Sequence, residues 1–228
     1  MADTVKVQTL VDTSHRTALV LTNLSDGTGE TAVLKANGAA LNGAFRTLTL
    51  EANSSLAFFR IGELITANTS GATGVVADQD KLANGAVVIK VVSCVGTFNT
   101  GESLTGNLSS VVRIQSGAQV IPTYRFTIDR MVYSVSGGVA VLLWGGQGGG
   151  ANSTVAWAAS DSSDVVFPEI GGALTNDAVS PTGNLLVTTR GFVANSTYSI
   201  LVDLKKSQTS YTAILRERNP IFGYPNSF

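Results

Sequence analysis

Ser14, His15 and Asp12 are close in the sequence. They are the residue types of a nucleophile, a general base and the acid that orients the base. His15 is the single histidine among 228 residues. Serine catalysis brings these groups together in space, and in many hydrolases the serine lies in a G-x-S-x-G turn, which this sequence lacks. We therefore interpret His15 as a surface turn residue.

Cys94 is the single cysteine, so no disulfide can form within the chain. It lies in "VVIKVVSCVG", a strand-like apolar run where we expect a buried, unreactive thiol. One histidine and one cysteine also exclude a zinc site built from these ligands within the chain. We predict no catalytic residue, no metal and no cofactor, and hence a protein that is not an enzyme.

Three further patterns resemble sites but fit ordinary turns better. "GQGGGA" at Gly146–Ala151 satisfies G-x-G-x-x-A, yet a β-like segment follows it where a phosphate site needs a helix. "DGTGE" at Asp26–Glu30 carries too few oxygen ligands for a calcium loop. Asp161, Asp164 and Glu169 show no partner that would prepare one carboxyl for acid–base chemistry.

Composition narrows the function classes. Charged residues are 14% of the chain, the net charge is −1, and apolar residues are 44%. Scattered basic residues predict no nucleic-acid binding, and a weakly charged surface favours an assembly. We see neither an N-terminal signal peptide nor an apolar run that could span a membrane, so we expect no membrane partner and synthesis in the cytoplasm.

The elements that position these residues read as strands. Alternating or β-branched runs bounded by Gly, Asn, Asp and Ser recur along the chain, for example "TVKVQTLVD" from Thr4. Strands of this length at regular turn spacing are typical of a sandwich or barrel. The expected fold is all-β: a jelly-roll-like β-sandwich interrupted by a small inserted β-barrel-like domain.

A duplicated phrase marks the insertion. "GELITANTS" from Gly62 and "GESLTGNLS" from Gly101 share Gly, Glu, an apolar residue, Thr, Asn and Ser at identical offsets. Two hairpin-like copies flanking the strand "AVVIKVVSCVG" could close a small barrel. We therefore expect an outer sandwich from residues 1–57 and 120–228, with residues 58–119 as the inserted domain.

Aromatic residues are the candidate interaction surface. Trp144 and Trp157 flank the Gly-rich turn, where they could pack a hairpin core or form an exposed sugar-binding platform. The C-terminal "RNPIFGYPNSF" lacks strand alternation and could lie on a partner or on its own domain. Its candidate contact residues are Pro220, Phe222, Tyr224 and Phe228.

Three segments resemble a recurring type of virion structural protein in tailed bacteriophages. They are "ALVLTNLSDGTGETAVLK", "MVYSVSGGVAVLLWGG" and "GGALTNDAVSPTGNLLVTTRGFVANSTYSILVDLKK". The segment with "GELITANTSGATGVV" and "GTFNTGESLTG" resembles a small Gly/Thr-rich β-module of other phage structural proteins. The resemblance covers most of the outer domain and carries no catalytic motif.

The resemblance implies a capsid cement (decoration) protein at the virion surface, made in the host bacterial cytoplasm. Its expected partners are the major capsid protein and further copies of itself, with a homotrimer as the expected state. The alternative is a tail, neck or baseplate component, such as a carbohydrate-binding module that contacts the host surface through Trp144 or Trp157.

Overall fold

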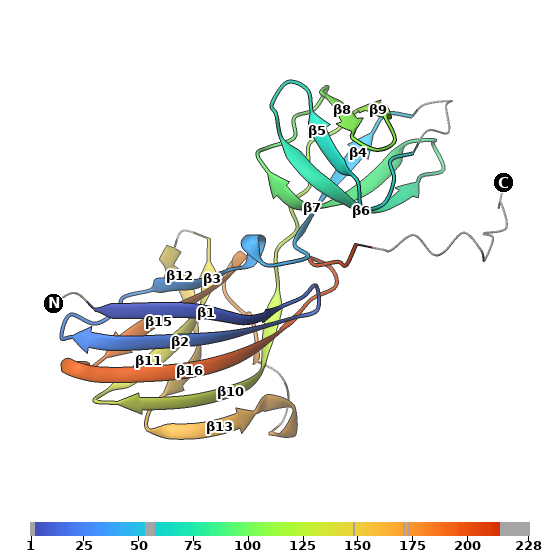
Figure 1. The fold of residues 1–228 in the computed structure, drawn as a ribbon. Helices are drawn as coiled ribbons and strands as arrows, with labels where there is room; N and C mark the ends of the chain where they lie inside the picture. Colours follow the sequence, from blue (N-terminus) through green and yellow to red (C-terminus); the bar gives the residue numbers. More distant parts are fainter. Residues whose placement is uncertain (1–2, 53–57, 148, 171, 173, 215–228) are drawn as a thin grey trace. The chain divides into compact units, whose positions relative to one another are not determined.

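The structure is a computed structural model that describes residues 3–52, 58–147, 149–170, 172 and 174–214. It is all-β, as the sequence predicts (Figure 1). The chain divides into two compact units. The first unit contains residues 1–44 and 123–211, and the second contains residues 45–122 with the described residues 212–214. Within the described ranges, no helix is long and apolar enough to cross a membrane.

Two antiparallel sheets build the first unit. In spatial order, one sheet contains β1 (Thr4–Asp12), β2 (Arg16–Asp26), β16 (Ala194–Lys206), β10 (Phe126–Ser136) and β13 (Ser162–Val166), with β14 (Leu174–Thr175) also paired to β10. The other contains β12 (Gly149–Ala159), β11 (Val139–Gly146), β15 (Pro181–Arg190) and β3 (Val33–Asn37). Two short 3₁₀ turns, η1 (Gly38–Ala40) and η2 (Phe167–Glu169), lie in the connections.

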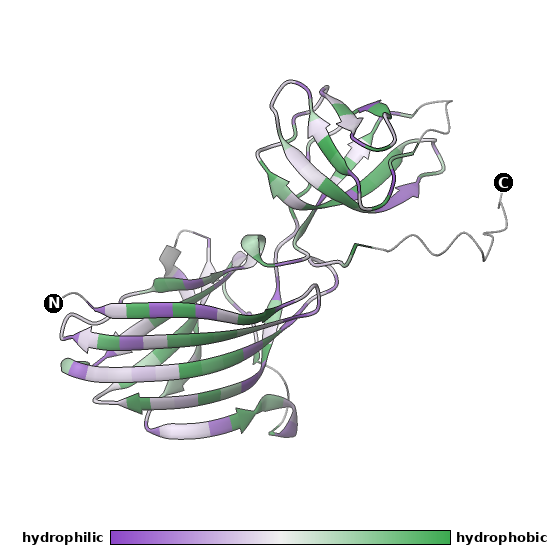
Figure 2. Cartoon of the chain, in the orientation of Figure 1, coloured by the Kyte–Doolittle hydropathy of each residue, from purple (hydrophilic) through white to green (hydrophobic). Residues whose placement is uncertain are grey.

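The core of the first unit lies between these two sheets. Alternation along β2 turns Leu19 and Leu21 inward, and β11 contributes Leu142 and Trp144 from the opposite sheet to the same cluster. The rings of Phe126 and Trp144 meet edge to face with their centroids 5.5 Å apart. The alternation is visible as bands of hydropathy along the strands (Figure 2). The sandwich is thus confirmed, while the jelly-roll pattern of connections stays a prediction.

β1 differs from the other strands of its sheet because all but its last residue are exposed. Val5 and Val7 lie directly opposite the buried Asn23 and Leu21 of β2, so their side chains point to the core side of the sheet. Each is nevertheless 39–40% exposed, on a strand that lies at the edge of its sheet. We call Val5 and Val7 the edge stripe.

The second unit is one antiparallel six-stranded sheet with its own core. Its spatial order is β4 (Phe45–Leu50), β7 (Val87–Val95), β6 (Thr73–Lys81), β5 (Leu64–Ala67), β8 (Ser103–Gly106) and β9 (Val112–Ile114). Inward residues such as Leu48, Ile65, Ile89 and Leu104 are completely buried. These β-branched and leucine side chains alternate with half-exposed residues, which explains why short segments form strands here.

The boundaries of the inserted part differ from the expected residues 58–119. The sequence predicts β4 as part of the outer sandwich, but this strand pairs along its whole length with β7, from Phe45 opposite Val92 to Leu50 opposite Val87. The insertion therefore begins at Phe45, because strand pairing rather than sequence similarity defines the unit. At the other end, Val120 bridges to Thr47, which extends the unit to Pro122.

The expected barrel is also corrected. The strand between the two copies of the phrase, β7, does not lie between them in the sheet; β5 and β8 pair directly instead. The sheet does not close into a continuous barrel, because the chain at β9 and beyond meets β4 through isolated bridges, Leu50 to Gln115 and Thr47 to Val120. The second unit is an incompletely closed sheet with neighbouring repeats.

Candidate functional site

The two copies of the duplicated phrase are related by an approximate two-fold axis. Thr66 of the first copy pairs with Thr105 of the second in the antiparallel β5–β8 ladder. The hairpins match residue for residue: Thr66 faces Thr73 across one hairpin, and Thr105 faces Val112 across the other. Sequence repetition is therefore structural repetition, with equivalent residues in equivalent places.

The glutamate of each copy binds the turn of the other copy. Glu63 accepts hydrogen bonds from the backbone N–H groups of Leu108 (3.1 Å) and Ser109 (2.9 Å) and from the Ser109 hydroxyl (2.8 Å). Glu102 accepts from the Ser70 N–H (2.9 Å) and the Ser70 hydroxyl (2.8 Å). We call Glu63, Ser109, Glu102 and Ser70 the reciprocal clasp.

Each clasp carboxylate also binds its own copy at a local turn. Glu63 accepts from the Arg60 N–H (2.6 Å), and Glu102 accepts from the Asn99 N–H (2.7 Å). Burial raises the pKa of Glu63, but the hydrogen bonds from Ser109, Arg60 and Leu108 outweigh it and lower the pKa overall. The pKa of Glu102 is lowered in the same way by Ser70 and Asn99, against desolvation. Both side chains therefore act as structural anions.

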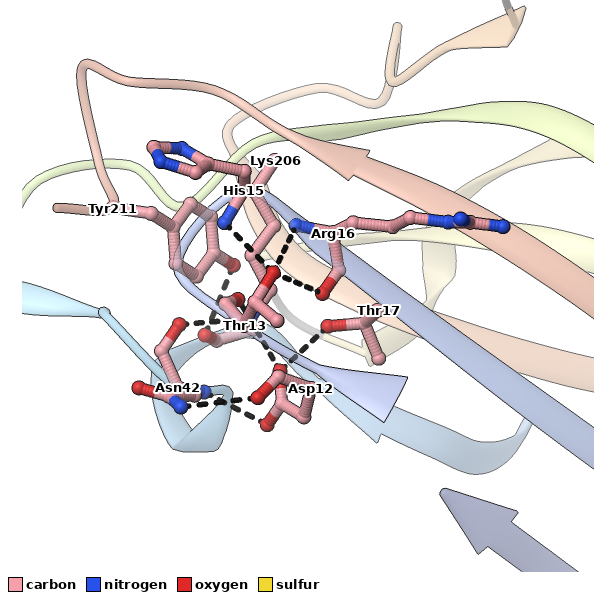
Figure 3. A network of polar contacts seen from close by, with 9 residues as sticks. Asp12, Thr13, His15, Arg16, Thr17, Asn42, Lys206 and Tyr211 are labelled. Carbon is pink, nitrogen blue, oxygen red and sulfur yellow. Dashed lines mark hydrogen bonds and ion pairs between the residues drawn. The ribbon is translucent and has the colours of Figure 1, made fainter. Parts of the chain in front are cut away.

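A second polar network surrounds Lys206, whose side chain is completely buried (Figure 3). Its Nζ donates to the Asp12 carboxylate (2.5 Å) and to the carbonyls of Thr13 and Asn42 (both 2.7 Å). Asp12 also accepts from the Thr17 hydroxyl (2.7 Å). The network joins the β1–β2 turn to the end of β16.

The charges of this network suit anchoring rather than catalysis. Burial lowers the pKa of Lys206, although Asp12 opposes that effect. Burial also raises the pKa of Asp12, but hydrogen bonds from Lys206, Asn42 and Thr17 lower it overall. All three ammonium protons are occupied, so Lys206 has none to transfer without losing a bond.

Asp12, Ser14 and His15 do not form a triad. The Asp12 carboxylate is taken up by Lys206, Thr17 and Asn42, and the His15 ring points away from it (Figure 3). His15 instead contacts Gln208: the His15 Nδ1 lies 2.8 Å from the Gln208 Nε2. The interpretation of His15 as an exposed turn residue is confirmed.

Trp144 does not belong to an interaction surface. It is 1% exposed and packs against Phe126 in the core. Trp157 is partly buried, packs against the same core, and meets Phe167 edge to face at 5.2 Å. Both indoles sit in the packing of the first unit, because inward positions of β11 and β12 face the other sheet. The sugar-binding platform expected as an alternative is therefore absent at these residues.

The other sequence candidates fall in separate places. Pro220, Phe222, Tyr224 and Phe228 lie outside the described residues. "GQGGGA" lies in the β11–β12 hairpin, as expected, with Gly146 paired to Gly149.

The acidic candidates do not converge either. Asp164 is bound by Arg130, and Glu169 lies in η2. Asp26 accepts from Thr28, whereas Glu30 is buried elsewhere in the core. Within the described ranges, no three His, Cys, Asp or Glu residues are grouped to hold a metal ion.

Cys94 is partly buried, less than expected from its apolar strand, and its thiol donates to the Val91 carbonyl at 3.2 Å. Burial raises the pKa of this thiol. At neutral pH we expect iodoacetamide to alkylate Cys94 at least about tenfold more slowly than glutathione, and faster as the pH rises. Mass spectrometry of timed samples measures the rate. A rate equal to that of glutathione would contradict the shielding of this thiol.

Sequence reasoning missed a buried ion pair in the first unit. Lys35 and Glu30 form it with side chains that are 0% and 2% exposed. Glu30 also accepts from the Tyr198 hydroxyl (2.6 Å) and the Asn23 amide (2.5 Å). The available signal was a lysine in the apolar strand "TAVLKA", which alternation alone places on either face.

Comparison with known proteins adds no assignment. The sequence matches no protein-family model, no curated protein and no solved structure.

Proposed function

We propose that this chain is a non-enzymatic structural protein of a tailed-phage virion, a decoration protein that assembles with itself and binds the major capsid protein. The resemblance of three segments of the outer unit to phage structural proteins suggests the particle. The exposed edge of β1 is the single structural observation that supports an assembling role.

Among the described residues β1 pairs only with β2, so the other edge of this nine-residue strand is free. Such an edge presents unpaired N–H and C=O groups, and soluble proteins usually protect it with charge, proline or a covering element. Here Val5, Val7 and Val11 add apolar side chains, and Lys6 is the only cation on the strand. Covering an edge of this kind with another strand or sheet is favourable, because apolar side chains leave water and the free backbone groups become paired.

The edge is also self-complementary. If two copies of β1 pair antiparallel about Gln8, Val7 of each copy falls opposite Thr9 of the other. Cross-strand pairs of β-branched residues favour antiparallel pairing. A second copy of the chain therefore supplies a matching edge.

Replacing Val7 with lysine should abolish self-association at this edge, because a second cation on the strand opposes pairing. Light scattering after size-exclusion chromatography measures the mass of the wild type and of Val7→Lys. Val193→Lys, at an exposed position in the same unit, is the matched control and should keep the wild-type mass. A wild-type monomer at micromolar concentration, or an unchanged Val7→Lys oligomer, would count against the edge.

The location in the particle needs a separate experiment. Purified phage particles are separated into heads and tails, and the chain is quantified in each fraction by peptide mass spectrometry. Many copies on heads support the decoration role. A few copies on tails would overturn it in favour of a tail or baseplate component.

A further inference from the structure

The first unit contains a cavity beside the start of β10, with a volume of about 460 Å³. The cavity is lined by the first residues of β10, the end of β16, and the connection that contains η2 and β14. This volume is in the range of cavities that hold small ligands. The cavity shares Lys206 with the polar network around that residue, but none of its lining residues belongs to β1, so what it binds is independent of the assembly proposed above.

Two cations of the cavity lining lack a charged partner in the part of the chain that the structure describes. Among the described residues, neither Arg125 nor Lys205 forms an ion pair or a side-chain hydrogen bond. Lys205 lies directly opposite Arg16 of β2 in the ladder, where two like charges repel each other. Arg16 is satisfied by Asp203, which leaves Lys205 uncompensated.

An amide in the cavity is also unsatisfied. Asn176 uses its Oδ1 to accept from the Ala178 N–H at 3.0 Å, which holds the turn after β14. Its Nδ2 is buried and has no hydrogen-bond partner within the described ranges. Buried polar groups are almost always paired, so an orphaned donor on a cavity wall indicates a position where an acceptor binds.

The remaining lining indicates what kind of molecule carries that acceptor. Asp129, in the β-bulge of β10, is the one carboxylate of the lining and has no ion pair among the described residues. It can accept from a hydroxyl of a ligand, and it disfavours a doubly charged anion. Hydroxyls of Thr127, Thr175 and Ser207 and an apolar face of Pro168 complete the wall.

We propose that this cavity binds a sugar acid, a ring that carries one carboxylate and several hydroxyls. Arg125 and Lys205 neutralise the carboxylate, the Asn176 Nδ2 donates to a ring or hydroxyl oxygen, and Asp129 accepts from a ring hydroxyl. Pro168 covers the apolar C–H face of the ring. Lys206 is neutralised by Asp12, so the two cations and the single carboxylate of the lining leave a net charge of +1. A ligand with one negative charge matches it.

Isothermal titration calorimetry of the full chain at low salt tests this, with glucuronate as the probe. We expect saturable binding with a Kd on the order of millimolar, and no binding of glucose, which has the same ring without the carboxylate. Inorganic phosphate should bind at least about tenfold more weakly, because Asp129 opposes its second charge. The sugar acid could be a free molecule or the end of a glycan, and a uronic-acid oligosaccharide distinguishes the two. If the oligosaccharide binds more tightly than glucuronate, the ligand is the end of a glycan; if it binds equally, the ligand is the free acid.

Variants place the binding in the cavity. Arg125→Gln and Asn176→Asp should each weaken glucuronate binding about tenfold or more, since one removes a cation and the other replaces a donor by an anion. Asn176→Asp keeps the Oδ1 acceptor for Ala178, so the turn is preserved. Lys81→Gln, an exposed cation of the second unit, is the control and should bind as the wild type does. Equal binding of glucose, preferred binding of phosphate, no binding of glucuronate, or full binding by both cavity variants would each overturn the proposal.

Discussion

Replacing Lys35 with methionine should destabilise the first unit by about 3–5 kcal/mol, the cost of leaving a buried charge without its partner. Lys35 and Glu30 are almost completely shielded from water, and the Glu30 carboxylate would then face only the hydrogen bonds of Tyr198 and Asn23. Burial and the hydrogen bond to Glu30 raise the pKa of Tyr198, so its hydroxyl remains a donor over the whole accessible pH range. Denaturant unfolding followed by hydrogen exchange of β2, β3 and β16 measures the loss.

A double variant separates the charge from the packing. In Lys35→Met with Glu30→Gln, the amide still accepts from Tyr198 and no charge is buried, so most of the lost stability should return. Lys81→Met, at an exposed site, is the control and should change stability by less than about 0.5 kcal/mol. A loss below about 1 kcal/mol for Lys35→Met alone would mean that the pair contributes little to the fold.

The second large effect is expected at the reciprocal clasp. Glu63→Ala removes the acceptor for the Ser109 hydroxyl and for three backbone N–H groups, those of Arg60, Leu108 and Ser109. Unsatisfied buried donors are costly, and we expect a loss of about 3 kcal/mol in the second unit. Hydrogen exchange should rise first in the turn at Leu108 and Ser109, which belongs to the other copy of the phrase.

Low pH should also destabilise the second unit, through the same two glutamates. The folded-state pKa of Glu63 and of Glu102 is lowered, so their contribution is complete above the unfolded value of about 4.3 and is lost as the pH falls through the folded value. The second unit should therefore lose stability progressively below about pH 5.

Glu63→Gln tests this assignment because it cannot titrate. It should be less stable than the wild type at neutral pH and should show a shallower loss in acid. Asp80→Asn, at an exposed position of β6, is the control and should keep the wild-type acid profile. An unchanged acid profile in Glu63→Gln would contradict the role of the clasp.

Alternation in the sequence predicted the strands well, because a half-buried strand needs only local period-two patterning. Leu19 and Leu21 face the core for this reason. The same pattern predicted β1 as a strand but does not show how far it is covered: Val5 and Val7 alternate as in a covered strand, yet they are 39% and 40% exposed. Whether a neighbour covers a strand is a property of the other sheet, and one strand's residues carry no information about it.

Local sequence patterns also do not show which strands pair with each other. The assignment of β4 failed because its partner, β7, lies about forty residues later and is chosen by the closure of the second unit. The repeat itself was readable, but the exchange of glutamates between copies was not, because each hydrogen bond joins residues more than thirty positions apart. The hydrogen bond from the Tyr198 hydroxyl to Glu30 is long-range in the same way, because it joins residues 168 positions apart.

The exchange of glutamates sets an order of events during synthesis. When residues 59–70 leave the ribosome, the carboxylate that will bind the Ser70 turn has not yet been made, and Glu63 has no turn to bind until Ser109 follows. The first hairpin therefore waits as an open structure while some forty more residues are translated. Its apolar face, with Ile65 and Ala67, has to avoid other nascent chains during that interval.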